Sequence, residues 1–216
     1  MPSMASFRQV LKICWWKGCE LQSMANDWTI NRTSGPSQLP ITVAEAKAKL
    51  NLSAADDTHD AEIQRAITAA TEQVEQDTGI AAITQTFVEY RNEFCGDAIQ
   101  LHRRPVQSIT SVTYANDDGT QTLATSVYGF DQPRRQVYLK SGQTWPSTID
   151  EQNAVAVTFV AGFGLVADNV PRLIQEAILL QVGAWFYDPA MEMPGRDAWS
   201  NAYERIICRL MGGNYP

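Results

Sequence analysis

The 216-residue sequence lacks the short patterns that mark most catalytic sites. It contains no GxSxG elbow, no GxxxxGK[ST] phosphate loop and no HExxH zinc motif. Only two histidines are present, which is too few for most acid-base schemes. The sequence therefore favours a protein that is not an enzyme and that carries no cofactor.

Cysteine pairs and long apolar runs are also missing. The four cysteines include no CxxC pair, so the sequence fits neither a disulfide scaffold nor a zinc site built from close ligand pairs. No apolar run approaches the roughly 18 residues that span a bilayer. The longest, residues 177–186, is interrupted by Gln181. We expect reduced thiols and no membrane partner.

Positive charge is scarce in most of the chain. Lysine and arginine number 17 against 24 aspartates and glutamates, for a net charge of −7. Residues 1–38 hold four basic and two acidic side chains, which leaves a net charge of −9 on the remainder. Tight binding to nucleic acid requires a basic surface that contacts phosphates. This composition argues against DNA binding as the main activity.

The first part of the chain reads as an extension followed by helices. Residues 1–38 show no sustained periodicity and end in turn formers at 31–37, which predicts an N-terminal extension and linker. Thr42 and Glu45 have the spacing of a capping box and predict a short helix after Thr42. A second helix is expected to begin at Asp56-Asp57, whose carboxylates would cap it, and to end at Gly79.

The second helix has one apolar and one acidic side. Its apolar positions, spaced four, three and four residues apart, are Ile63, Ile67, Ala70 and Val74. Its polar side carries Glu62, Glu72, Glu75 and Asp77, opposed only by Arg65. This pattern predicts a helix with one buried stripe and an acidic surface.

Residues 83–164 change to short segments rich in β-branched and aromatic residues, which predicts a small antiparallel sheet. A hairpin turn is expected at 116–119, because its Asp-Gly pair supplies positive φ angles. Gly162 and Gly164 imitate a dinucleotide-binding loop, but the next helix is expected to start only at Pro171. We interpret the two glycines as a hinge between sheet and helix.

Two further helices are expected in the last 50 residues. The helix after Pro171 is apolar around much of its circumference and should be buried. The helix at 197–210 is amphipathic, with Trp199, Tyr203, Ile206 and Leu210 on one side.

Asp56, Asp57 and Asp60 form a DDxxD string such as binds magnesium-diphosphate in some prenyl-transferring enzymes. Those enzymes need a second acidic motif and an all-helical bundle, neither of which is visible here, so capping of a helix N-terminus is favoured. A small magnesium-dependent enzyme that uses these three carboxylates remains an alternative. A second alternative is a nucleic-acid-binding factor associated with DNA packaging.

Several blocks resemble the head-tail connector (adaptor) proteins of long-tailed bacteriophages, in the subfamily with a β-region between helices. They are Leu39 to Lys47, the helix ending at Thr78-Gly79, Leu101 to Tyr114, Gly142 to Pro146, Val155 to Gly164, and Pro171 to Trp185. The resemblance implies a structural virion protein at the head-tail interface, present in the host cytoplasm during assembly. It implies a homo-oligomeric ring, usually twelve-fold, that docks under the portal protein and presents a platform to the next head-completion (stopper) or tail protein.

Together these observations predict an α+β fold, in which a helical connector core carries an inserted small antiparallel β-sheet region. The expected parts are residues 1–38 as extension and linker, 39–82 as the first part of the helical core, 83–164 as the β-rich insertion, and 165–216 as the second part of the core with a docking helix.

Two groups of residues are candidates for function. The last helix is locally basic and amphipathic, and its expected portal-docking residues are Trp199, Tyr203, Arg205, Ile206, Arg209 and Leu210. Double-stranded DNA should pass through the ring without tight binding, and the carboxylates expected to line its conduit are Glu62, Glu72 and Glu75.

Overall fold

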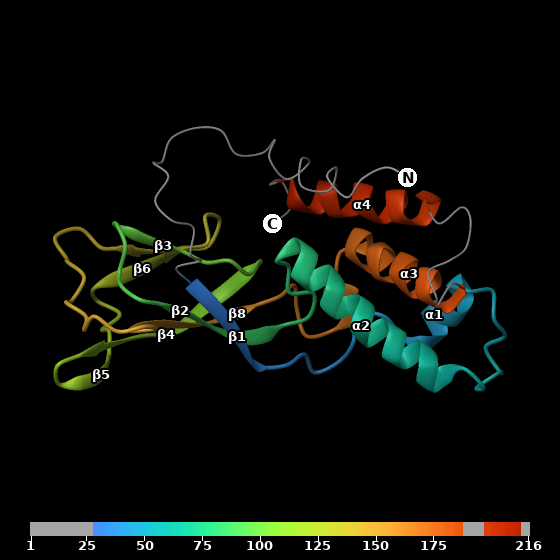
Figure 1. The fold of residues 1–216 in the computed structure, drawn as a ribbon, viewed down its shortest axis with the longest axis horizontal. Coiled ribbons are helices and arrows are strands. Elements are labelled where there is room, and N and C mark those ends of the chain that lie inside the picture. The colour runs from blue at the N-terminus through green and yellow to red at the C-terminus, as the bar shows by residue number, and fades with distance from the viewer. Residues whose placement is uncertain (1–27, 188–196, 213–216) are drawn as a thin grey trace, which may run out of the picture.

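The computed structural model describes residues 28–187 and 197–212, which form an elongated molecule with strands at one end and helices at the other (Figure 1). The helices are α1 (Val43–Lys49), α2 (Asp60–Thr78), α3 (Arg172–Tyr187) and α4 (Asp197–Met211), with a 3-10 turn at Ala167–Asn169. The strands are β1 (Trp28–Ser34), β2 (Gln85–Arg91), β3 (Ala98–Gln100), β4 (Val106–Asn116), β5 (Gly119–Thr122), β6 (Tyr128–Asp131), β7 (Gln136–Leu139) and β8 (Val155–Ala161).

The strands form two antiparallel sheets. A five-stranded sheet has the order β1-β2-β8-β4-β5, and a three-stranded sheet has the order β3-β7-β6. Side chains from both sheets share one hydrophobic cluster, in which Phe87, Ile99, Val112, Val137 and Phe159 are almost completely buried. The strands therefore enclose a core of their own, and we call this end of the molecule the sheet half.

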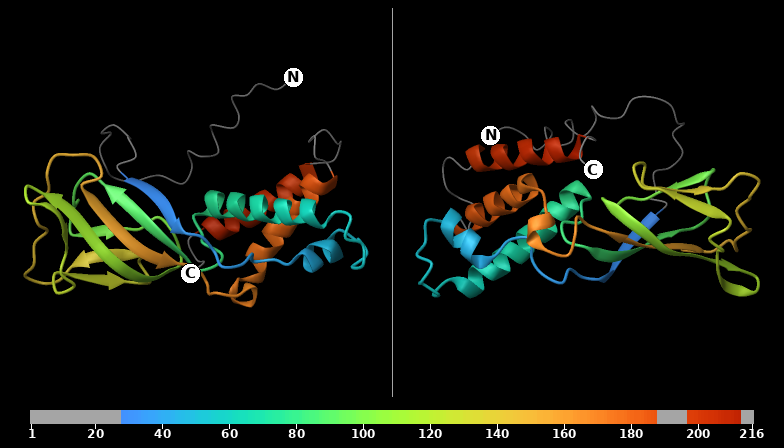
Figure 2. Two further views of the ribbon diagram at one scale, coloured as in Figure 1. Left: turned by 90° about the horizontal axis from the view of Figure 1, so that it is seen from below. Right: turned by 180° about the vertical axis from the view of Figure 1, so that it is seen from behind.

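The predicted helical core with a small inserted sheet is wrong, although a mixed α+β class is compatible with the structure. The helices pack around a separate cluster at the other end of the molecule, as two further views confirm (Figure 2). Apolar side chains of the strands pack against each other rather than against the helices. The sheets therefore form a hydrophobic core separate from that of the helices. We call the helical end the helical half.

Strand β1 lies in the segment predicted to be a linker. It pairs antiparallel with β2, with Trp28 opposite Arg91 and Arg32 opposite Phe87. Its side chains are mostly exposed, because β1 is an edge strand whose neighbours cover little of it. An edge strand of this kind needs no alternating apolar pattern, and for that reason no strand was predicted for this segment. Residues 1–27 lie outside the described part of the chain.

The helical half is organised around α2 and α3. The predicted stripe of α2 is confirmed, since Ile63, Ile67 and Ala70 are each 0% exposed. They pack with Ile174 and Ile178 of α3 in one cluster, to which α1 and α4 also contribute. Burying an aliphatic side chain of this size stabilises a fold by about 1.5 to 3 kcal/mol. This stripe therefore holds the helices together. No described helix has the length and hydropathy of a membrane span.

Most predicted helix ends and turns are confirmed, and one is wrong. Thr42 and Glu45 form the reciprocal capping box of α1, and Gly79 ends α2 with a φ of 68°. The hairpin at 116–119 joins β4 to β5. Helix α2, however, begins at Asp60, and the Asp56 side chain accepts hydrogen bonds from the backbone and hydroxyl of Thr58 instead of capping the helix.

Candidate functional site

Two of the three carboxylates predicted to line a conduit are exposed on α2. The side chains of Glu62 and Glu72 are 57% and 59% exposed. Because consecutive helical residues are rotated by about 100°, these two positions lie roughly 80° apart around the helix axis. Each already has a basic neighbour: His59 Nδ1 is 3.1 Å from Glu62, and Arg32 donates a 3.2 Å hydrogen bond to Glu72. Arg32 belongs to β1, a strand that the sequence did not reveal.

The third carboxylate, Glu75, is buried and does not join the other two. It is 8% exposed, and its Oε1 accepts hydrogen bonds from the Ala82 backbone and from Gln85 Nε2, each 2.8 Å long. Burial raises the pKa of this carboxyl group, and the two hydrogen bonds partly oppose that shift. The prediction that Glu75 lines a conduit is corrected: it fastens the end of α2 to the start of β2.

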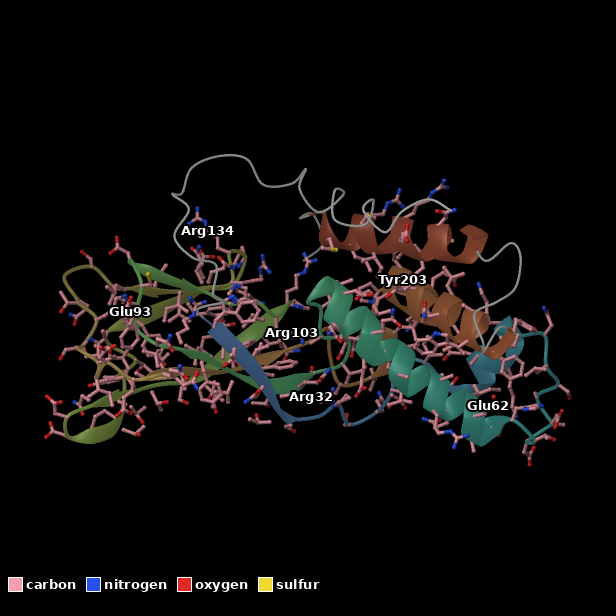
Figure 3. The ribbon with its side chains drawn as sticks, in the orientation of Figure 1. Arg32, Glu62, Glu93, Arg103, Arg134 and Tyr203 are labelled. Carbon is pink, nitrogen blue, oxygen red and sulfur yellow. The ribbon has the colours of Figure 1, made fainter. Side chains whose placement is uncertain are left out.

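The apolar side of α4 faces the helical core. Leu210 is 0% exposed, and Tyr203 and Ile206 pack against the same cluster as the α2 stripe. The Tyr203 hydroxyl donates a 2.7 Å hydrogen bond to Asp77 of α2 (Figure 3). Burial is the main reason why the pKa of Tyr203 is raised. These three residues are therefore not a free docking face, contrary to the sequence-based expectation.

Two of the six predicted docking residues remain on the outer side of α4. Arg205 and Arg209 are exposed and stand four residues apart, which places them on the same side of the helix. Trp199 belongs to α4, but its side chain lies outside the described residues. The structure thus separates the predicted docking set into an inner apolar group and an outer cationic pair.

Arg104 ties α4 to the rest of the molecule. It is 7% exposed, and its Nη2 donates hydrogen bonds to the carbonyl oxygens of Leu210, at 2.8 Å, and Thr78, at 3.3 Å. The last carbonyls of a helix have no partner within the helix and carry the negative end of its dipole. One guanidinium therefore binds the C-terminal ends of α2 and α4 together. This role of Arg104 was not predicted from the sequence.

Three chain segments lie side by side where the two halves meet: residues 79–85, 102–106 and 162–164. We call this region the junction. Its backbone hydrogen bonds run from Ala81 N to Arg104 O, Arg104 N to Gly79 O, Gly162 N to Pro105 O, and Thr84 N to Gly164 O, with lengths of 2.8 to 3.0 Å. Arg103, beside the end of α2 in Figure 3, adds a 2.7 Å hydrogen bond to the Glu75 carbonyl. The junction therefore holds both halves in one fixed arrangement.

A buried ion cluster lies in the sheet half, next to the junction. Glu89 is 0% exposed, and its carboxylate accepts hydrogen bonds from Arg91 Nη2, at 2.7 Å, and from the His102 backbone, at 3.1 Å. The ring nitrogen Nδ1 of His102 also lies 3.1 Å from Glu89 Oε1. Buried charge requires this degree of pairing. The cluster is structural, because Glu89, Arg91 and His102 are paired with one another within the protein.

The acidic string before α2 does not converge on one point. Asp56 is bound to Thr58, whereas Asp60 Oδ1 lies 2.5 Å from the ammonium of Lys47, a contact made by charge without the geometry of a well-directed hydrogen bond. Within the described residues, no group of three His, Cys, Asp or Glu side chains is arranged to hold a metal ion. The carboxylates of Asp56 and Asp60 are thus engaged in a local turn and an ion pair.

A shallow concavity of about 420 Å³ lies over the β6-β7 hairpin. Its lining residues are Phe130, Asp131, Gln132, Pro133, Arg134, Gln136 and Tyr138. The Tyr138 ring covers Gly129, where a Cβ atom would come within 2.5 Å of it. The aromatic ring thus packs along the strand pair and leaves the concavity open to solvent.

No protein-family model and no curated protein matches this sequence. Solved structures with a similar fold include three chains of gene transfer agent particles. A chain in the neck of an empty particle, computed with C6 symmetry, is 22% identical, with a TM-score of 0.68 over 82% of this chain and 94% of that one. A chain in the virion of the native particle is 23% identical, with a TM-score of 0.65 and coverages of 82% and 93%. A chain in the native neck, computed with C12 symmetry, is 20% identical, with a TM-score of 0.63 and coverages of 84% and 94%.

Proposed function

We propose that this chain is a structural head-tail connector, or adaptor, of a tailed phage or phage-like particle. The observation that carries the proposal is the fold. Chains from gene transfer agent necks share it over more than four-fifths of this chain and over nearly their whole length. The sequence resemblance to phage connectors points to the same role without using the fold. No catalytic activity is needed for it.

In this proposal the chain forms a homo-oligomeric ring, twelve-fold as in most connectors, between the portal protein and the next stopper or tail protein. Symmetric rings are built from heterologous contacts, in which one surface of each subunit meets a different surface of its neighbour. The junction supports this role, since a subunit whose halves are linked by several backbone hydrogen bonds can present the same surfaces at every position of a ring. The mature ring would reside in the virion.

The portal contact is assigned to the outer side of α4. Arg205 and Arg209 are exposed there, while Tyr203, Ile206 and Leu210 of the apolar side pack against the helical cluster. Arginine is common in protein interfaces because its planar group forms bidentate bonds to carboxylates. The Arg205→Glu/Arg209→Glu variant should lose portal binding without unfolding. The matched control, Arg134→Glu on the exposed turn between β6 and β7, should retain it.

The DNA conduit is assigned to the exposed side of α2 that carries Glu62 and Glu72. Figure 3 places Glu62 near the end of α2 that is remote from the sheets. Carboxylates on a channel wall repel phosphates and so prevent the counterion-release attraction that would hold DNA. The wall would guide DNA without retaining it.

Electron microscopy of the purified protein, with and without its portal, tests the central proposal. Rings that stack on the portal along a common axis are the expected result. A protein that stays monomeric at high concentration and ignores the portal would contradict it.

A further inference from the structure

The loop between β8 and α3 displays two neighbouring aliphatic side chains to solvent. The large hydrophobic residues exposed within the described chain are Tyr138, Leu165, Val166, Tyr187 and Met211. Only Leu165 and Val166 are adjacent, and they are 64% and 49% exposed. We call this pair the aliphatic knob. Single exposed apolar residues are ordinary, whereas this pair places two aliphatic side chains side by side on one loop.

The loop that carries the knob is held in place from other parts of the chain. Gln38 Nε2 donates a 2.8 Å hydrogen bond to the Leu165 carbonyl, and the Thr84 backbone donates a 2.9 Å bond to the Gly164 carbonyl. Gly164 packs so closely on Asn169 that a Cβ atom would lie 2.3 Å from the Asn169 side-chain oxygen. The knob is therefore exposed on a fixed loop.

A buried glutamine fastens the next part of the loop. Gln175 of α3 is 6% exposed, and its side-chain nitrogen donates hydrogen bonds to the carbonyls of Ala167, at 2.9 Å, and Pro40, at 3.3 Å. Just before the knob, Phe163 packs against the helical cluster. A surface that is ordered before it binds loses less entropy on association. The loop is thus built as a preformed contact.

The surroundings of the knob carry little net charge. Asp168 and Arg172 form a 3.9 Å ion pair beside it, and their charges cancel. Copies of a chain with a net charge of −7 repel one another, so contact between them is least opposed where the surface is apolar and charge-balanced. An apolar centre with a polar rim is also the usual anatomy of a protein interface.

We propose that the aliphatic knob is the contact by which each copy of this chain binds the next copy in the ring. The inference rests on the ring assembly proposed above and adds the surface that forms it. A projecting loop suits a heterologous contact, because it inserts into a different part of the neighbouring copy rather than into its own equivalent. The partner that receives the knob is thus a second copy of this chain, and the contact is apolar.

The Leu165→Asp/Val166→Asp variant tests the proposal in the full-length protein. Both side chains are exposed, so the melting temperature should change by no more than about 2 °C. Ring formation, measured by mass photometry across a concentration series, should weaken by at least about tenfold. Met211→Asp, which alters a residue 54% exposed on α4, is the matched control and should form rings normally. Leu165→Ser/Val166→Ser repeats the test without added negative charge.

The possible outcomes distinguish the knob proposal from the proposal that the chain is a ring-forming connector. Rings formed equally well by wild type and both knob variants would overturn the knob proposal and leave the connector proposal standing. A wild-type protein that never forms rings, alone or on its portal, would overturn both. Knob variants that keep their rings but lose the portal would assign the knob to the portal and so contradict a contact between copies.

Photocrosslinking identifies directly which protein the aliphatic knob contacts. With p-benzoylphenylalanine at position 165, assembled wild-type rings should yield crosslinks between two copies of this chain. Mass spectrometry would then locate the receiving surface. Crosslinks to the portal alone would overturn the proposal.

Discussion

The indole ring of Trp28 stacks on the imidazole of His102, with centroids 3.8 Å apart and planes inclined by 10°. Trp28 is the first residue of edge strand β1, and His102 belongs to the buried cluster around Glu89. The stack therefore links the exposed edge of the five-stranded sheet to His102, whose Nδ1 lies beside the fully buried Glu89. It adds a fixed point to a strand whose other side chains are mostly exposed.

Trp28→Ala should loosen β1 without unfolding the sheet half. Loss of the stacked ring should lower the free energy of unfolding by about 1 to 3 kcal/mol. Backbone hydrogen exchange in residues 28–34 should speed up more than exchange in β8. Thr29→Ala, an exposed change on the same strand, is the control. Unchanged protection of β1 in Trp28→Ala would show that backbone pairing alone holds it.

Glu75→Gln should change how stability depends on pH. Burial raises the folded-state pKa of Glu75, so its protonated form is favoured by folding, and that contribution is lost as pH rises through the raised pKa. Glutamine keeps an oxygen that can accept from Ala82 and Gln85 but has no charge to bury. The stability of Glu75→Gln relative to wild type should therefore increase between pH 4 and pH 7. Thermal melts across this range measure it, and a constant stability difference between variant and wild type would contradict a buried carboxyl group with a raised pKa at this position.

Arg104→Met should release the end of α4. Two helix-end carbonyls lose a charged donor, which should cost about 2 to 3 kcal/mol in unfolding free energy. Limited proteolysis should then cut near residues 208–212 faster than in wild type. The control Arg205→Met removes an exposed arginine from the same helix and should leave the cutting rate unchanged. Equal rates in both variants would mean that apolar packing alone retains α4.

Gly162→Ala should be far more disruptive than its size suggests. Gly162 has a φ of 138°, and a Cβ atom there would lie 2.6 Å from the backbone of Ile83 and Thr84. Strained backbone and a clash with a neighbouring segment should together cost more than about 3 kcal/mol. Gly35→Ala has open space around the new methyl group and is the control. Denaturant titration compares them, and similar midpoints would contradict the tight packing of the junction.

Glu62→Lys/Glu72→Lys should make assembled rings bind DNA. The change replaces two exposed carboxylates by cations, and lysine contacts to phosphate release counterions. Fluorescence anisotropy should show binding that falls steeply with salt, and particles carrying the variant should eject DNA more slowly. Asp150→Lys/Glu151→Lys makes the same charge change on an exposed loop of the sheet half and should bind less tightly. Tight binding by the wild type at physiological salt would contradict a repulsive conduit.

Local sequence patterns were sufficient to predict the elements that are stabilised by contacts within a few residues. The capping box of Thr42 and Glu45 and the left-handed Gly79 satisfy backbone groups within a few residues, so their effect is visible in the sequence. The apolar stripe of α2 follows from helical periodicity in the same way. The neighbours of these residues are fixed by spacing along the chain.

The errors concern residues whose partners lie outside their own helix or strand. Glu75 looks like a surface carboxylate until Ala82 and Gln85 close over it. In the sequence, Leu210 looks like one end of a free amphipathic face. In the structure, its side chain lies in the helical cluster and its carbonyl accepts a hydrogen bond from Arg104. β1 carries few apolar residues and becomes a strand only because β2 offers it an edge. Tertiary contacts determine the environments of Glu75, Leu210 and β1.

The two halves alternate along the chain, and this order constrains how the protein is made. The sheet half combines residues 28–34 with residues 85–161, while the helical half combines α1 and α2 with α3 and α4. During synthesis β1 emerges first but must wait for β2, and α2 cannot bury its stripe until α3 has left the ribosome. Neither half can be cut out as one continuous piece. The subunit therefore reaches its final structure only near the end of translation, which delays its assembly surfaces until the chain is almost complete.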